Sequence, residues 1–260
     1  MRFNWTAVDK IYDILVEHNI CPIVETLFIP HCIQKSPEFW YIPKDYKMWA
    51  EIIKKFVIHV QERYGKEEVE NWYFEIWNEP DNREAWVEDP RTFFALYDYM
   101  EHAIHSVNPN LKVGGPATKQ WNEGYDMFRA FLDHCAHGLN YVTGEFGTRL
   151  DFISVHCKGG YPRSTYNPST GVMFNSVEKY IDIIKKEYPQ FTPLNKYPST
   201  DLIKKPVFNA YVLLSKLGTQ RLSVKCDQEG FGRKFGVLPT KAEDVLSVMV
   251  WNFEDGMADD

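Results

Sequence analysis

Short apolar segments alternate with amphipathic helical patterns through most of this chain, and this alternation constrains the fold more than any other feature. Apolar residues at helical spacing predict helices at about 8–15, 48–64, 93–104, 125–134 and 177–187. Continuous apolar runs predict buried strands at about 21–28, 72–77, 111–114 and 150–155. Strands that alternate with helices of this length predict parallel βαβ units and an α/β fold.

Polar side chains follow several of these strands at their C-terminal ends. Glu25, Glu79 and His156 each come at or just beyond the end of an apolar run. A (β/α)₈ barrel places its active site at this end of the strands, because the βα loops open there. A doubly wound sheet is the alternative, although no glycine-rich phosphate loop follows any predicted strand. The pattern therefore favours a (β/α)₈ barrel.

The helical pattern stops after about Leu217. Strands are predicted at about 221–225, 234–238 and 245–253, with turns between them. We therefore expect a barrel domain over residues 1–217 and a β-rich segment, part of a β-sandwich, over residues 218–260. A complete barrel needs eight βα units in roughly 250 residues. Because the first 217 residues supply four predicted strands, the barrel is expected to be incomplete.

Composition argues against several classes of partner and site. The formal net charge is −7 and no Lys/Arg-rich run occurs, which argues against a nucleic acid or an anionic membrane surface. The five cysteines show no C-x-x-C spacing, so neither a structural zinc site nor a disulfide framework is expected. We predict no metal and no cofactor. No run approaches the roughly 18 apolar residues of a membrane span, and residues 1–6 do not read as a signal peptide.

The segment Trp77-Asn78-Glu79-Pro80 carries the strongest chemical signal. It ends a strand of aromatic and aliphatic residues, so the Glu79 carboxyl is expected in a partly apolar pocket. Desolvation there raises the pKa of a carboxyl and suits it to protonate a leaving group, as glycoside hydrolysis requires. Asn78 can hydrogen-bond a sugar hydroxyl, and Pro80 stiffens the turn. The competing interpretation is a strand-ending turn without chemistry.

The longer string Phe74–Asp81 resembles glycoside hydrolase family 39, which contains β-xylosidases and α-L-iduronidases. Residues 3–6, 22–25 and 205–210 are similar to the same family, so the resemblance covers nearly the whole chain. It implies a retaining (β/α)₈ glycosidase with Glu79 as the acid/base, Asn78 and Glu25 in contact with a carbohydrate substrate, and a lysosomal or extracytoplasmic location.

Residues 143–159 resemble the α-L-iduronidases more closely than the β-xylosidases. This resemblance implies that His156 and Lys158 contact the substrate and that Lys158 binds the carboxylate of a uronic acid. A charged sugar needs such a cation, whereas a neutral pentose does not. A solvated lysine beside a core histidine is the alternative interpretation, and a β-xylosidase is the alternative enzyme.

A second catalytic carboxylate is not evident from the sequence. In the family the nucleophile is a glutamate at the end of the seventh barrel strand, and a retaining mechanism requires it. Nothing between Tyr188 and Pro206 reads as a strand that ends in glutamate. We therefore assign no nucleophile, expect a truncated chain that also lacks the first barrel strands, and expect poor hydrolysis. A carbohydrate-binding remnant without turnover and a misfolded fragment are the alternatives.

Overall fold

The computed structural model describes residues 3–35, 42–86, 88–119, 122–157, 170–191, 216–226 and 235–252. The chain divides into two compact units, an N-terminal unit (residues 1–192) and a C-terminal unit (residues 193–260). The predicted domain boundary near Leu217 stays a prediction, because residues 192–215 lie outside the described ranges. The family-like segment 205–210 lies outside them as well.

The N-terminal unit alternates helices and strands as the sequence pattern predicts. Its elements are, in chain order, α1 (Thr6–Glu17), β1 (Ile23–Glu25), the 3₁₀ helix η1 (His31–Ile33), α2 (Tyr46–Tyr64), α3 (Lys66–Val69), β2 (Tyr73–Glu75), η2 (Pro90–Thr92), α4 (Phe93–His105), β3 (Lys112–Thr118), α5 (Asn122–His137), β4 (Phe152–Val155), α6 (Thr170–Glu187) and η3 (Pro189–Phe191). All four predicted strands and all five predicted helices of this part are present, with shifted ends.

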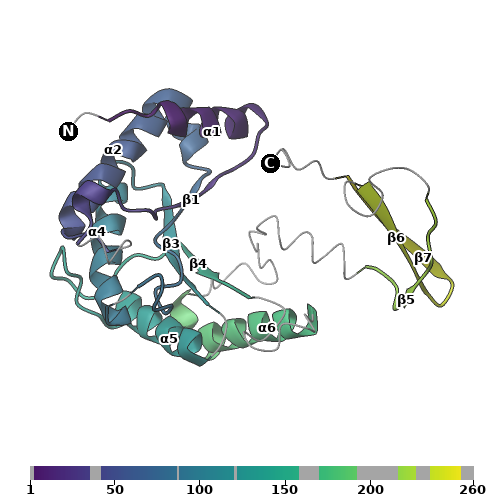
Figure 1. The fold of residues 1–260 in the computed structure, drawn as a ribbon. Coiled ribbons are helices and arrows are strands. Elements are labelled where there is room, and N and C mark those ends of the chain that lie inside the picture. The colour runs from purple at the N-terminus through teal and green to yellow at the C-terminus, as the bar shows by residue number, and fades with distance from the viewer. Residues whose placement is uncertain are drawn as a thin grey trace. The chain divides into compact units, whose positions relative to one another are not determined.

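The four strands form one parallel sheet in the order β1-β2-β3-β4. Each neighbouring pair is joined by a connection that contains a helix, which is the βαβ arrangement. Figure 1 shows α1, α2, α4 and α5 along one side of this sheet. The α/β fold with a parallel sheet is thus confirmed. Closure of the sheet into an eight-stranded barrel stays a prediction, since the described residues include four of its strands.

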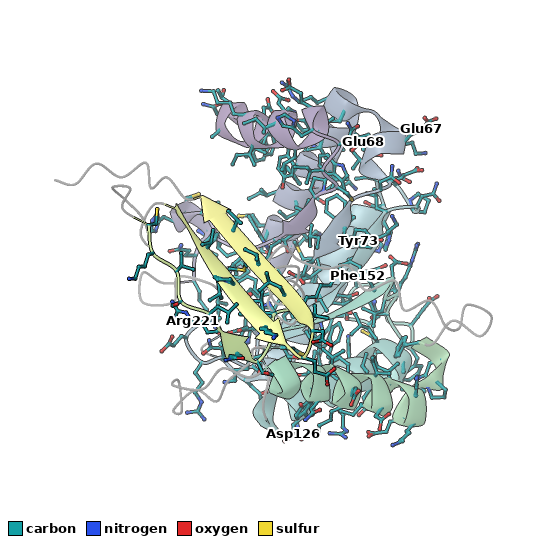
Figure 2. All side chains as sticks on the ribbon, turned by 90° about the vertical axis from the view of Figure 1, so that its right-hand side faces the viewer. Glu67, Glu68, Tyr73, Asp126, Phe152 and Arg221 are labelled. Carbon is teal, nitrogen blue, oxygen red and sulfur yellow. The ribbon has the colours of Figure 1, made fainter. Side chains whose placement is uncertain are left out.

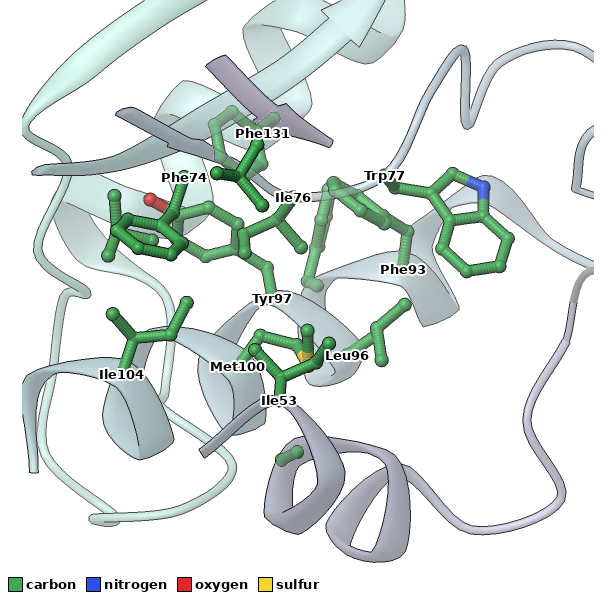
Figure 3. Close-up of a cluster of buried hydrophobic side chains, with 14 of the residues drawn as sticks. Ile53, Phe74, Ile76, Trp77, Phe93, Leu96, Tyr97, Met100, Ile104 and Phe131 are labelled. Atoms are coloured by element: carbon green, nitrogen blue, oxygen red, sulfur yellow. The ribbon is translucent and has the colours of Figure 1, made fainter. Parts of the chain in front are cut away.

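The helix-facing side of the sheet holds the main hydrophobic core. Three side chains in and directly after β2 are fully buried: Phe74, Ile76 and Trp77. They pack among side chains of α2, α4 and α5, which include Ile53, Phe93, Leu96, Tyr97, Met100 and Phe131 (Figure 3). Burying each large apolar side chain contributes roughly 1.5–3 kcal/mol. This core fixes β2, the strand that leads to Glu79, between its neighbours.

The opposite face of the sheet carries aromatic rings at Tyr73 and Phe152. They meet edge to face with centroids 5.3 Å apart, although β3 lies between their strands (Figure 2). They can meet because β3 has a glycine, Gly114, beside Phe152 in the register. A β-carbon at Gly114 would collide with the carbonyl oxygen and the ring of Phe152. Glycine at this position therefore permits the close approach of β4 to β3.

Several strand lengths differ from the sequence pattern, β1 and β3 among them. β1 covers Ile23–Glu25, which is shorter than the predicted 21–28. The backbone at Phe28 takes a left-handed conformation and its ring is exposed, so the apolar run does not continue as a strand. β3 continues to Thr118, beyond the predicted end at residue 114, because its pairing with β4 extends through two glycines and a proline.

The C-terminal unit contains three antiparallel strands among its described residues: β5 (Gln220–Arg221), β6 (Phe235–Ala242) and β7 (Val245–Asn252). The predicted β-rich character is present, while its place in a β-sandwich stays a prediction. β5 is much shorter than the predicted strand at 221–225. None of the helices in the described residues is long and apolar enough to cross a membrane.

Candidate active site

Glu79 lies where the chain leaves β2 but stays beside β3. The amide of Ile76 donates to the carbonyl oxygen of Gly114 at 2.9 Å, and the amide of Glu79 donates to that of Ala117 at 3.0 Å. Between these bonds the backbone turns through left-handed conformations at Trp77 and Glu79, with φ of 69° and 48°. Non-glycine residues in this region cost about 1–3 kcal/mol each and are concentrated at functional sites. The turn directs the Glu79 side chain away from a regular strand course.

β3 is irregular at the same level. Its register with β4 shifts between Pro116 and Thr118, and Ala117 has a φ of 52°. Such bulges change the direction of side chains near active sites. Here the carbonyl of Ala117 accepts from Glu79 on one side of β3, and the carbonyl of Thr118 accepts from the amide of His156 at 2.8 Å on the other. β3 thereby aligns Glu79 and His156 across a single strand.

The side chains of Glu79 and His156 meet directly. The Nδ1 atom of His156 lies 2.8 Å from Oε1 of Glu79, although the two residues are 77 positions apart in the sequence. The Glu79 side chain is 10% exposed and that of His156 is 20% exposed. When Nδ1 carries its hydrogen, the imidazole donates to the carboxylate and fixes its orientation. The structure thus brings together two of the residues that the sequence singled out.

Asn82 holds the second oxygen of Glu79, and sequence reasoning did not select it. Its side-chain Nδ2 group donates to Oε2 of Glu79 at 3.1 Å, and its backbone N–H donates to the backbone carbonyl oxygen of Glu79 at 2.9 Å. Both carboxyl oxygens of Glu79 therefore have a neighbour that can donate. The available sequence signal was weak: Asn82 stands three residues beyond Glu79 in a polar turn.

Asp81 is a second carboxyl group close to Glu79. Asp81 is 8% exposed, and its Oδ1 atom accepts from the backbone amide of Lys119 at 3.1 Å. Burial raises the pKa of Asp81 to about 6, against smaller opposing contributions from the Lys119 hydrogen bond and charge, and the negative charge of Glu79 adds to the increase. The other oxygen, Oδ2, is buried without a hydrogen-bond partner in the part of the chain that the structure describes.

The other predicted site residues are placed as follows. Asn78 is half-buried directly before Glu79. Glu25 ends β1 and is exposed, in register with Glu75 on β2. Glu25 is thus at the same end of the sheet as the turn that carries Glu79. Lys158 lies outside the described residues.

The described residues offer no group of three or more His, Cys, Asp or Glu side chains arranged to hold a metal ion. The groups that the described residues place at the ends of β2 and β4 are a buried carboxyl, an imidazole and an amide donor. Such a carboxyl can give a proton to a leaving group and take it back from water.

The fold and this site together define an α/β protein with a buried, hydrogen-bonded carboxyl at the C-terminal edge of a parallel sheet. The family model described as glycosyl hydrolases family 39 matches residues 1–200. The chain belongs to glycoside hydrolase family 39.

Relatives of two activities match the chain. The β-xylosidase of Geobacillus stearothermophilus is 35% identical over 162 residues, which are 59% of this chain and 30% of that protein. The α-L-iduronidase of Mus musculus is 32% identical over 166 residues, which are 61% of this chain and 25% of that protein. The matches span about a third or less of the length of these curated relatives.

Solved structures show the same two activities. A bacterial orthologue of human α-L-iduronidase superposes with a TM-score of 0.63 at 26% identity, covering 73% of this chain and 30% of that one. A monomeric β-xylosidase from Caulobacter crescentus superposes with a TM-score of 0.57 at 31% identity, covering 70% of this chain and 38% of that one. These likenesses assign the family and leave the substrate open.

Proposed function

We propose that this chain carries the acid/base half of a retaining glycosidase site, with Glu79 as the acid/base. The contact that supports this role most strongly is the 2.8 Å approach of His156 Nδ1 to the buried Glu79 carboxyl. A general acid must be aimed at one place on the substrate, and hydrogen bonds to both oxygens supply that aim. Membership of family 39 supplies the reaction, hydrolysis of an O-glycosidic bond in a carbohydrate.

The proposed substrate is a terminal uronic acid of a glycosaminoglycan-like chain. The support is the likeness of residues 143–159 to α-L-iduronidases, which includes Lys158 two residues beyond His156. A lysine ammonium can meet the carboxylate of a uronic acid in a charge-assisted hydrogen bond. Hydrolysis of a β-xyloside is the second candidate, because β-xylosidases match the chain at similar identity.

Substitution of Lys158 tests the choice between these substrates. A charge-assisted hydrogen bond contributes roughly 1.5–3 kcal/mol, so Lys158→Ala should weaken binding of a uronic acid by about ten- to a hundredfold. Binding of xylose should hardly change. Isothermal titration calorimetry of both sugars against both forms of residues 1–260 measures these differences.

Lys10→Ala provides the matched control, because Lys10 is exposed on α1 and its removal changes the net charge equally. Equal losses of affinity for the uronic acid and for xylose would identify Lys158 as a structural residue and would remove the support for the uronide.

The proposed site lacks an assigned nucleophile. Glu25 is exposed at the end of β1, and we propose that it contacts substrate hydroxyls together with Asn78. The sequence from Tyr188 to Pro206 contains no glutamate, and residues 192–215 lie outside the described ranges. Glu79 alone can protonate a leaving oxygen, but a retaining reaction also needs a group that captures the anomeric carbon.

A further inference from the structure

Asn82 meets the carboxyl of Glu79 with an amide whose orientation the turn itself fixes. Its Oδ1 atom accepts from the backbone N–H of Glu84 at 3.2 Å, so its Nδ2 group is the end that faces Oε2 of Glu79, at 3.1 Å. An amide nitrogen donates hydrogen bonds and does not accept them. Oε2 of Glu79 therefore meets a donor in either protonation state of the carboxyl.

The backbone of this turn keeps Asn82 beside Glu79. The N–H of Asn82 donates to the carbonyl oxygen of Glu79 at 2.9 Å, and the carbonyl oxygen of Asn82 accepts from the N–H groups of Ala85 at 2.9 Å and Trp86 at 2.7 Å. Trp86 is 1% exposed and meets the buried ring of Trp77 edge to face, with centroids 5.0 Å apart. Because both rings are packed in the core, the turn between them has a fixed course.

We propose that Asn82 is a positioning residue for the acid/base: its Nδ2–H holds Oε2 of Glu79 and thereby favours the ionised form of that carboxyl. The inference rests on the proposed role of Glu79. A hydrogen bond donated to the charged form of a carboxyl stabilises that form. The carboxylate is what remains after Glu79 protonates a leaving group, and it is also the form that takes a proton from water in the second half of a retaining reaction.

The alternative is that Asn82 only shapes the turn. Its Oδ1 contact with the N–H of Glu84 is an ordinary turn contact, and an aspartate makes the same one. The Nδ2 group takes no part in that contact. Asn82→Asp therefore separates the two roles, because it keeps the acceptor for Glu84 and loses the donor to Glu79.

The titratable groups around Glu79 are the same in all variants of Asn82. His156, at the end of β4, contacts Oε1 of Glu79 at 2.8 Å. Asp81 lies in the same turn; burial raises the pKa of its carboxyl, Lys119 opposes the increase, and the charge of Glu79 adds to it. A comparison with the unsubstituted protein therefore isolates the contribution of Asn82.

The test is an NMR titration of residues 1–260 labelled with ¹³C at the glutamate and aspartate carboxyls, with Glu79→Gln to assign the Glu79 resonance. Asn82→Ala removes the donor at Oε2, so the pKa of Glu79 should rise by about one pH unit. Asn82→Asp places a carboxylate oxygen where Nδ2 lies, 3.1 Å from Oε2. The increase should then be about two pH units or more, because two carboxyls in such contact share one proton.

Asn110→Asp is the matched control. Asn110 is exposed ahead of β3, and its Nδ2 group donates to Oε1 of Glu70 at 3.1 Å. The variant makes the same chemical change beside another glutamate, at the far end of β3 from Glu79, so the pKa of Glu79 should stay constant.

A pKa of Glu79 that is unchanged or lower in either Asn82 variant, with the amide spectrum of a folded protein, would overturn the proposal. The titration needs no turnover, so its outcome is independent of the proposed function. An inactive Glu79 would show itself instead in the hydrolysis of substrates with poor leaving groups, which Glu79→Gln would then leave unchanged.

Discussion

Glu79 is positioned by residues that are far apart in the sequence. Its backbone bonds to Ala117, its carboxyl contacts His156, and its turn is anchored through Asp81 to Lys119. Glu79 and Asp81 are both buried, so these contacts lie within the folded unit and not on its surface. The site is therefore a property of three adjacent parallel strand ends and not of one loop.

Substitution of the proposed acid tests its role directly. Glu79→Gln keeps the shape of the side chain and its contacts with Asn82 but cannot deliver a proton. A general acid contributes typically 10²–10⁴-fold, so hydrolysis of substrates with poor leaving groups should fall by about a hundredfold or more. Activated aryl substrates need little protonation and should lose much less. The measurement is turnover of an alkyl and an aryl glycoside of the same sugar by both forms.

Equal and negligible effects on the two glycosides would show that Glu79 is not the acid. Glu84→Gln is the matched control, because Glu84 is an exposed glutamate in the same turn. It should leave both rates unchanged.

Among the site residues, the sequence predicted those that follow an apolar strand pattern and missed those that stand in a turn. Glu79 and His156 follow apolar strands, so the parallel arrangement brings them to one edge of the sheet. Asn82 and Asp81 stand in a polar turn, and turn residues of this kind occur in many surface loops. Their contacts form next to the left-handed backbone at Trp77 and Glu79, which no residue type at those positions signals.

Packing of β3 against β4 depends on one glycine. Gly114→Ala should destabilise the fold by about 1–3 kcal/mol, the usual cost of overpacking, because its β-carbon would collide with Phe152. Gly115→Ala is the matched control, since the nearest atom to its β-carbon would be the Ile76 carbonyl oxygen at an ordinary 3.5 Å. Urea unfolding of the two variants measures the difference. A Gly114→Ala protein as stable as Gly115→Ala would contradict the close approach of these strands.

A charged histidine links α4 to the start of β4. His105 Nδ1 lies 2.6 Å from Glu101 Oε1, and its Nε2 lies 3.2 Å from Asp151 Oδ2. Burial lowers the pKa of His105, but hydrogen bonds to Asp151 and Glu101 outweigh it and raise the pKa to about 9. Because the folded-state pKa lies above the ordinary value of 6.5, the stabilisation is fully present below about pH 6.5 and is lost as the pH rises through about 9.

Protonated His105 should therefore contribute about 1–2 kcal/mol to the free energy of unfolding, a value reduced for its partial exposure to solvent. This contribution should disappear between pH 6.5 and 9.5. His105→Gln should remove this contribution, whereas His102→Gln, at an exposed position of the same helix, should keep it. Urea unfolding at both pH values measures it. The same pH dependence in His105→Gln and in the unsubstituted protein would exclude a charged His105.

Element types were predictable from periodicity, while element lengths depended on tertiary pairing. The helical spacing of apolar residues located α2 and α4 closely, and Asp45 fixes the start of α2 by accepting from the amide of Met48. β3 extends through Gly114, Gly115 and Pro116 because β4 pairs with each of these residues. No local propensity signals a strand over such residues.

The chain combines a helix-backed parallel sheet with an antiparallel unit, and the described residues proposed for the site belong to the first. A retaining site divides its reaction between two carboxylates about 5–5.5 Å apart. Since no second carboxylate is assigned, residues 1–260 should hydrolyse an aryl-iduronide several orders of magnitude more slowly than a full-length family member. Rates within about tenfold of each other would show that a carboxylate such as Glu25 serves as the nucleophile.

Chemical rescue tests the central proposal most directly, namely that Glu79 is the acid and that the residues the structure describes supply no assigned nucleophile beside it. A small anion such as azide can attack the anomeric carbon in place of a carboxylate nucleophile, with Glu79 protonating the leaving group. Hydrolysis of an aryl-iduronide with a poorly activated leaving group by residues 1–260 is measured with and without azide. We predict an increase of at least about tenfold with formation of a glycosyl azide, and no such increase in Glu79→Gln. A rate that azide leaves unchanged, or raises equally in Glu79→Gln, would contradict the account.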